Sequence, residues 1–230
     1  MLPSDSVARD VVGEKRAAAE AAAALVEDGM TLGLGTGTTV AELLGPLARL
    51  RLSLRCVATS PRTEAAARAL GLTVVPFDGI GRLDLAIDGA DQIAPDGWLV
   101  KGGGGAHTRE KLVAAAADRF VVIADSSKPV DALHAPVPLE LLRFGLAATL
   151  RRLGTVSLRD APDSPDGGVI ADFTGACTDP ADLARTLGSV PGIIGHGLFP
   201  PELVTMVLVA RGADVRATTP GAATPGPTGS

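Results

Sequence analysis

Three segments of this sequence bring together residue types that bind anions, accept protons and stabilise negative charge. They are residues 33–39, rich in glycine and threonine, residues 88–91, with two aspartates, and residues 101–111, with four glycines, lysines and a glutamate. Each segment follows a short apolar run that is typical of a buried strand. In an open parallel sheet, ligands bind where the carboxyl ends of the strands meet. We therefore expect the three segments to form one site.

The first segment, GLGTGTT, has the composition of an anion-binding loop. Glycines allow close approach of the backbone, and the N–H groups at a helix start favour negative charge. A dinucleotide site would need a third spaced glycine and an acidic residue farther along the chain, and the sequence has neither. It also lacks the Gly-Lys-Ser/Thr of a P-loop. A small phosphate fits better, and the plainer alternative is that Thr38 only caps a helix. The candidate binding residues are Thr36, Gly37, Thr38 and Thr39.

The second segment consists of Asp88, Gly89, Ala90 and Asp91. Two carboxylates three residues apart at a strand end can point into one pocket and accept hydrogen bonds from hydroxyl groups. Their oxygens also suit Mg²⁺. The plainer alternative is an Asp-rich turn.

The third segment, KGGGGAHTREK, combines a cation, a backbone loop and a candidate base. Four consecutive glycines are entropically costly, so a tight backbone requirement is the expected reason for them. Glu110 lies in the first turn of a helix that Thr108 is expected to cap, and its plainer role is an interaction with the helix dipole. The segment supplies the candidate binding residues Lys101, Gly102, Gly103 and Gly104.

Together these groups suit proton abstraction next to a carbonyl. Glu110 would take the proton, Lys101 would stabilise the developing enediolate oxygen, and the phosphate loop would position the substrate. His107 is the second candidate base because its ordinary pKa is well placed, although a core or surface role is expected for it.

The composition favours a cytoplasmic protein with a small-molecule ligand. The 230 residues include 21 basic and 26 acidic side chains, a net charge of −5, so the chain lacks the positive charge that binding to nucleic acid requires. Neither a membrane span nor a secretory signal is evident, which excludes a membrane partner. Cys56 and Cys177 are far apart and the three histidines are isolated, so we expect reduced thiols and no metal centre.

Alternating strand and helix periods predict an α/β fold with an open, mainly parallel sheet flanked by helices. Strands are expected at residues 30–34, 54–58, 73–76, 82–87, 98–101 and 119–124, and helices at 7–27, 38–50, 61–70 and 108–118.

The pattern after residue 130 is β-α-β-β-α-β, which is typical of a smaller ferredoxin-like α+β domain, the split βαβ motif. Its strands are expected at 136–141, 155–159, 168–173 and 192–196, and its helices at 141–153 and 180–188. A strand at 205–210 is expected to return to the first sheet. We therefore predict a catalytic domain of residues 1–130 and 199–216, a small domain of residues 131–198, and a disordered tail at 217–230.

The same segments resemble the type A ribose-5-phosphate isomerases. The matching motifs are GLGTGTT (33–39), TSPRTE (59–64), DGADQI (88–93), KGGGGAHTREK (101–111), VVIADSSK (121–128), PLE (138–140), HGLF (196–199) and RGADV (211–215). The resemblance implies a cofactor-free aldose–ketose isomerase of the pentose phosphate pathway. Such an enzyme interconverts D-ribose 5-phosphate and D-ribulose 5-phosphate through a cis-enediolate, and forms a homodimer or homotetramer.

The resemblance also implies roles for individual residues. Glu110 matches the family's catalytic carboxylate. From their chemistry, since a pair of carboxylates can take the O1 proton, we assign Asp88 and Asp91 to opening the sugar ring. Lys101 is assigned to the enediolate oxygens, with a structural salt bridge to Asp88 as the alternative. The substrate-binding matches are Thr36–Thr39, Asp88–Asp91, Lys101–Gly104, Lys128 and, more weakly, Lys15.

Three positions depart from the family pattern. Thr38 stands where serine is common and keeps its hydroxyl group, Gln92 replaces a glutamate, and His107 replaces an apolar residue. None of the proposed catalytic groups is missing.

Two functions from other classes remain as alternatives. A non-catalytic sugar-phosphate sensor would share the phosphate loop, but it would not need Lys101 or Glu110 and would normally carry a DNA-binding helix pair. A transferase that depends on CoA or a nucleotide would need a glutamate nucleophile and a larger cofactor site. Turnover of ribose 5-phosphate with nothing added would distinguish the isomerase from both.

Overall fold

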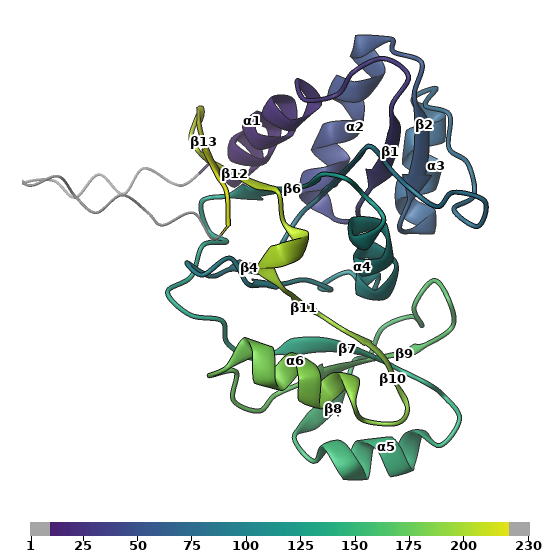
Figure 1. Ribbon diagram of the computed structural model, residues 1–230, viewed down its shortest axis with the longest axis vertical. Coiled ribbons are helices and arrows are strands. Elements are labelled where there is room, and N and C mark those ends of the chain that lie inside the picture. Colours follow the sequence, from purple (N-terminus) through teal and green to yellow (C-terminus); the bar gives the residue numbers. More distant parts are fainter. Residues whose placement is uncertain (1–9, 221–230) are drawn as a thin grey trace, which may run out of the picture.

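The structure of the protein is a computed structural model that describes residues 10–220. Figure 1 shows a larger part, built around the N-terminal elements, and a smaller part built from the elements between β7 and β10. The strands β4 and β11 lie between the two parts.

A six-stranded sheet forms the centre of the larger part. Its order is β13-β12-β6-β3-β1-β2, and all neighbouring pairs are parallel except β12 with β13. This arrangement confirms the predicted fold class and the return of the C-terminal strand to the first sheet. The strands are β1 (Thr31–Leu34), β2 (Arg55–Ala58), β3 (Leu85–Asp88), β6 (Phe120–Asp125), β12 (Met206–Arg211) and β13 (Asp214–Thr218).

Helices cover both faces of this sheet because its central strands are apolar on both sides. In β6, Ile123 packs into one core and Val122 into the other, as the twofold period of a strand requires. The first core includes residues of α1 (Val11–Ala23), α2 (Thr38–Leu50) and α3 (Pro61–Ala69), and the second includes residues of α4 (His107–Ala115).

The smaller part is an antiparallel sheet of order β10-β7-β9-β8. Apolar residues of two helices pack against this sheet in a third core. In chain order this is the β-α-β-β-α-β motif expected from the sequence. Its elements are β7 (Val137–Leu141), α5 (Leu146–Leu153), β8 (Val156–Leu158), β9 (Val169–Phe173), α6 (Pro180–Gly188) and β10 (Ile193–His196). The proposed domain boundaries remain a prediction.

A short three-stranded sheet joins the two parts. It consists of β4 (Gln92–Ile93), β5 (Leu99–Val100) and β11 (Leu198–Phe199), in the order β11-β5-β4. A 3₁₀ turn (Pro201–Leu203) follows and leads into β12. Residues 98–101, predicted as one strand of the main sheet, therefore belong to this separate sheet instead.

Other predicted elements need correction. Residues 73–76 form only a single bridge, between Val74 and Cys56, and Pro76 has no N–H with which to continue a ladder. The helix expected at 141–153 begins only at Leu146. The helix expected at 7–27 is α1, which starts at Val11 after Asp10, whose carboxylate accepts the Gly13 N–H (2.9 Å).

The predicted tail begins too early, because β13 continues to Thr218 and pairs with β12. Residues 221–230 of that tail, and residues 7–9 of the first predicted helix, lie outside the described residues. Within residues 10–220, no helix is long and apolar enough to cross a membrane.

Candidate active site

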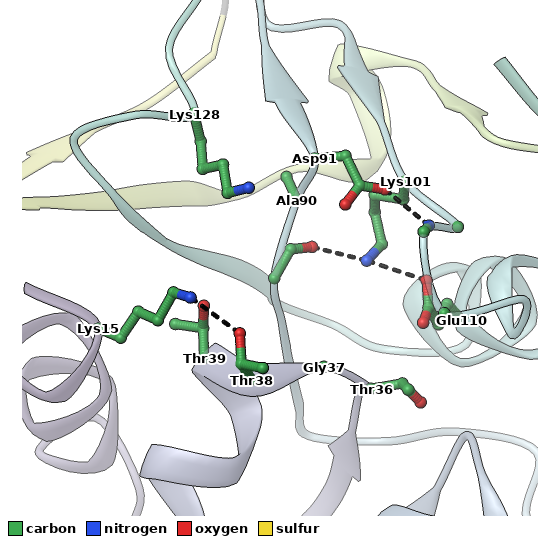
Figure 2. A pocket seen from close by; sticks show the side chains of 14 residues that line it. Lys15, Thr36, Gly37, Thr38, Thr39, Ala90, Asp91, Lys101, Glu110 and Lys128 are labelled. Carbon is green, nitrogen blue, oxygen red and sulfur yellow. Dashed lines mark hydrogen bonds and ion pairs between the residues drawn. The ribbon is translucent and has the colours of Figure 1, made fainter. Parts of the chain in front are cut away.

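The three segments singled out in the sequence meet in one pocket of about 120 Å³ (Figure 2). Residues after β1 and β3, the tetraglycine loop and the start of α4 contribute to it, as expected where parallel strands end. Among the candidate residues, Asp88 and the alternative base His107 do not line the pocket, and Asp88 contacts Lys101 instead. The lining residues are Lys15, Thr36, Gly37, Thr38, Thr39, Gly89, Ala90, Asp91, Lys101, Gly102, Gly103, Gly104, Glu110 and Lys128.

Lys101 is the charged centre of the site. Its Nζ lies 2.9 Å from Asp88 Oδ2 and 3.0 Å from Glu110 Oε2, and it donates to the Gly89 carbonyl at 2.6 Å. All three charged side chains are at most 4% exposed. The salt bridge to Asp88 that the sequence left as an alternative is therefore present, together with a second one to the candidate base.

Burial changes the protonation of these groups. Burial and the nearby charge of Asp88 raise the pKa of Glu110 to about 8, against the opposing effect of Lys101. Burial also raises the pKa of Asp88. For Lys101, burial disfavours the charge, but the two carboxylates outweigh it and raise the pKa. Lys101 thus stays cationic, and the raised pKa of Glu110, about 8, leaves this carboxyl group able to exchange a proton in the range where enzymes work.

Asp88 is held by more than Lys101. Its Oδ1 accepts the N–H groups of Gly89 (2.7 Å) and Thr36 (3.1 Å). A Cβ on Gly35 would lie 1.9 Å from the Asp88 carboxyl carbon, so glycine is required there for this carboxylate to fit. The phosphate-loop segment and the Lys101 cluster are therefore joined through one side chain.

The start of α2 forms the opposite side of the pocket. The helix begins at Thr38, and Gly37 occupies the cap position with a positive φ of 118°. Among the described residues, no side chain caps this helix start, so the alternative that Thr38 serves as the cap is wrong. Its N–H groups remain available for an anion.

Two lysines lie at the same end of the pocket as this helix start. Lys15 Nζ donates to Thr38 Oγ1 at 2.9 Å. Figure 2 shows Lys128 directed into the same space from the other side, with Lys101 and Glu110 farther along the pocket. The site is thus divided into a cationic, amide-rich end and an end that holds the buried base.

The first half of the tetraglycine loop packs too tightly to carry side chains. Gly102 has a φ of +110°, and a Cβ there would lie 2.7 Å from His107 Nδ1 and 2.8 Å from Pro138 Cβ. The Gly103 N–H donates to Asp91 Oδ2 at 2.8 Å, which attaches the loop to the second segment.

The helix after this loop begins one residue before the expected cap. Ala106 is the cap residue of α4 and Thr108 lies inside the helix, so the predicted cap is wrong. Glu110 nevertheless lies in the first turn, as expected.

His107 does not line the pocket. It is fully buried behind Gly102, and burial lowers its pKa to about 3. Gln92 is also turned away from the pocket, because its amide pairs with the backbone N–H and carbonyl of His134 (both 2.8 Å). Neither of these two unusual residues lines the pocket.

Arg159 is a site neighbour that the sequence analysis missed. It follows β8 in the smaller part, yet its guanidinium contacts the carbonyls of Gly102 and Gly103. No local pattern around Arg159 signals this contact, because it joins residues more than 50 positions apart. Within residues 10–220, no group of three or more potential metal ligands is gathered in one place.

Comparisons with known proteins agree with this geometry. The family model described as ribose 5-phosphate isomerase A (phosphoriboisomerase A) matches residues 55–214. Ribose-5-phosphate isomerase A of Rhodopseudomonas palustris (strain HaA2) is 45% identical over 214 residues, which cover 84% of this chain and 92% of the relative. That of Caulobacter sp. (strain K31) is 43% identical over 201 residues, covering 81% and 89%.

Solved structures show the same similarity. Ribose 5 phosphate isomerase A from Neisseria gonorrhoeae superposes with a TM-score of 0.87 at 28% identity, covering 92% of this chain and 98% of that one. A D-ribose-5-phosphate isomerase in complex with phospho-erythronic acid superposes with a TM-score of 0.85 at 31% identity, covering 91% and 99%. With a model match over most of its length and relatives of this identity, the chain belongs to the ribose 5-phosphate isomerase A family.

Proposed function

We propose that this chain is an aldose–ketose isomerase that interconverts D-ribose 5-phosphate and D-ribulose 5-phosphate. The observation that carries the proposal is the buried contact between Lys101 and Glu110 in a pocket whose other end is an uncapped helix start. A base, a fixed cation and a phosphate site are the groups that this reaction needs. Family membership supports the same substrate and reaction.

In the proposed reaction, Glu110 carries one proton between two neighbouring carbons. Its carboxylate removes the proton from C2 of the open-chain aldose, and the electron pair moves to O1 to give the cis-enediolate. The same proton returns to C1, and the proton on O2 moves to O1, which leaves the ketose. Lys101 stabilises the negative charge on O1 and O2 throughout, because its ammonium is fixed by Asp88 before the substrate arrives.

The phosphate end of the substrate binds at the start of α2. The hydroxyl groups of Thr38 and Thr39 and the N–H groups of residues 37–39 donate to the phosphate, and Lys15 and Lys128 supply positive charge. The Thr36 N–H, proposed from the sequence as a further donor, already donates to Asp88. This group does not change during the reaction, so its role is to position C1 and C2 beside Glu110.

Ring opening is assigned to the acidic segment. Asp91 is exposed to the pocket and can take the O1 proton of the closed sugar, aided by a water molecule. Asp88 is occupied by Lys101 and two backbone N–H groups. We therefore no longer assign ring opening to Asp88. Its proposed role is to fix Lys101.

The test is an assay of the purified protein with ribose 5-phosphate, in EDTA and with no added cofactor. Formation of ribulose 5-phosphate is expected. Binding of ribose 5-phosphate without turnover would instead favour the sensor alternative.

The location and the assembly of the protein are proposed from the family resemblance. We propose a cytoplasmic homodimer or homotetramer that needs no cofactor and has neither nucleic acid nor membrane as partner. Light scattering on the eluting peak of a sizing column measures the assembly, and a monomeric mass would contradict it.

A further inference from the structure

Arg159 connects the smaller sheet to the tetraglycine loop. Its Nη1 donates to the Gly102 carbonyl at 2.9 Å and to the Gly103 carbonyl at 3.2 Å. Its Nε and Nη2 donate to the two carboxylate oxygens of Asp172 on β9, at 2.7 and 2.6 Å. The side chains of Arg159 and Asp172 are 19% and 17% exposed, so this paired interaction is largely shielded from water.

The contact determines which way two peptide groups face. In a trans peptide the N–H points opposite to the C=O of the same unit. With the carbonyls of Gly102 and Gly103 turned toward Arg159, the N–H groups of Gly103 and Gly104 must point away from it. The first donates to Asp91 at 2.8 Å, as this geometry requires, and Gly104 lines the pocket.

The loop cannot hold this orientation through its own side chains, because it has none. Glycine has the greatest backbone freedom of any residue, and within the loop the Gly105 N–H bonds the Gly102 carbonyl in a single turn. Two neighbouring carbonyls pointing in one direction also repel each other. A guanidinium fixed by a carboxylate offsets that repulsion and restricts the loop from outside.

We propose that Arg159, anchored by Asp172, is a positioning residue that holds the tetraglycine loop so that the Gly103 N–H stays on Asp91 and the Gly104 N–H faces the reacting end of the sugar. The loop is joined to Lys101 at one end and precedes the helix of Glu110 at the other, whereas the phosphate end lies at Thr38 and Thr39. The smaller sheet thereby contributes to catalysis without touching substrate. This inference rests on the proposed isomerase function.

The experiment compares Arg159→Met with Arg143→Met. The control removes an arginine that pairs with Asp163 (2.6 Å) in the same part of the molecule but does not line the pocket. Three quantities are measured: kcat/KM for ribose 5-phosphate, the affinity for phospho-erythronic acid, and inhibition by inorganic phosphate. The acid presents a carboxylate where the enediolate has O1 and O2, while inorganic phosphate occupies only the phosphate end.

For Arg159→Met we expect kcat/KM and the affinity for phospho-erythronic acid to fall together by ~10–100-fold, as for misplaced catalytic groups. Inhibition by inorganic phosphate should stay within about twofold, and Arg159→Lys should recover part of the loss, because an ammonium can reach the carbonyls but cannot pair in two places with Asp172. Arg143→Met should match the wild type in all three measurements.

Several results would overturn the proposal. One is an Arg159→Met variant with wild-type kcat/KM; another is an equal loss of affinity for phosphate and for phospho-erythronic acid, which would indicate general structural damage. If Arg159→Met fails to fold, the nearly isosteric variant Asp172→Asn is measured in its place. Unchanged affinity of that variant for phospho-erythronic acid would also overturn the proposal. Absence of turnover by the wild type would contradict the proposed function instead, so the two failures are distinguishable.

Discussion

The ammonium of Lys101 and the carboxylate of Glu110 lie 3.0 Å apart in a buried ion pair. The proposed base and the proposed stabiliser of the enediolate are thus in contact before substrate binds. Because Asp88 holds the other side of Lys101 at 2.9 Å, the ammonium does not need Glu110 to stay in place. Glu110 is therefore able to accept a proton without releasing the cation.

Replacing the base is the most direct test of the site. Glu110→Gln is nearly isosteric but cannot accept a proton, so kcat should fall ~10²–10⁴-fold with KM little changed. The matched control is Glu64→Gln, since Glu64 also lies in the first turn of a helix but outside this pocket. Steady-state kinetics measure both. A Glu110→Gln variant with near wild-type kcat would refute the assignment.

The raised pKa of Glu110 predicts the pH profile. The base must be deprotonated in the free enzyme, and its pKa is about 8. Accordingly, kcat/KM should rise with pH and level off above about pH 8, with a slope that approaches one log unit per pH unit on the acid side. Initial rates between pH 6 and 9.5 measure this. A flat profile over that range would be inconsistent with Glu110 as the titrating base.

The same pKa predicts a gain in stability for the inactive variant. Glu110 has an ordinary pKa of 4.5 and a folded pKa of about 8, so the folded state keeps a proton that the unfolded chain releases. Its contribution to stability is complete below about pH 4.5 and is lost as the pH rises to about 8. The Tm of Glu110→Gln relative to wild type should therefore increase from pH 5 to pH 8. A difference in Tm that does not change with pH would show that burial does not raise the pKa of Glu110.

Lys101→Met should reduce both catalysis and stability. The change leaves two buried carboxylates without their cation, which costs about 3–5 kcal/mol, and it removes the charge that stabilises the enediolate. The Tm deficit should shrink as the pH falls, because burial raises the pKa of both carboxyl groups and protonation removes their charge.

Adding Asp88→Asn to Lys101→Met separates the two roles. The double variant should regain part of the Tm because one unpaired carboxylate is removed, but it should stay inactive. Recovery of kcat in the double variant would mean that Lys101 serves only as a structural partner.

The lysines at the phosphate end should affect binding more than turnover. Lys15→Met and Lys128→Met should each raise KM for ribose 5-phosphate several-fold with a smaller effect on kcat, because the phosphate is unchanged in the reaction. The rate with unphosphorylated ribose, which has no phosphate for these lysines to bind, should be unaffected. Arg16→Met, which removes a cation on α1 that pairs with Glu42 instead, is the control. Equal losses on both sugars would contradict a phosphate role.

The sequence could predict the features that depend on local chemistry. The continuous apolar run of β6 and the glycines that precede α2 are visible in the local sequence. Local patterns of this kind also place Thr38 and Glu110 at helix starts. The two-residue strands β4 and β11 could not be predicted, because two residues are too few for a periodicity.

Contacts between distant residues were also beyond the sequence. Lys101 pairs with both Asp88 and Glu110 only because β3 and α4 lie at the right separation. Arg159 contacts Gly102 only because the two parts of the molecule pack together. The cap expected at Thr108 was wrong because the helix begins one residue earlier, at His107, without a side-chain cap.

The place of β12 in the main sheet has a consequence for synthesis of the chain. β6 pairs with β3 on one side and with β12 on the other, and all of its residues are buried. During translation, the whole smaller sheet emerges from the ribosome before residues 206–211 can cover that second side. Until then β6 presents an unpaired apolar edge, which is the kind of surface that associates with other nascent chains. Truncation before Met206 should therefore give an aggregating product, and a chaperone that shields strand edges should raise the yield of the full-length enzyme.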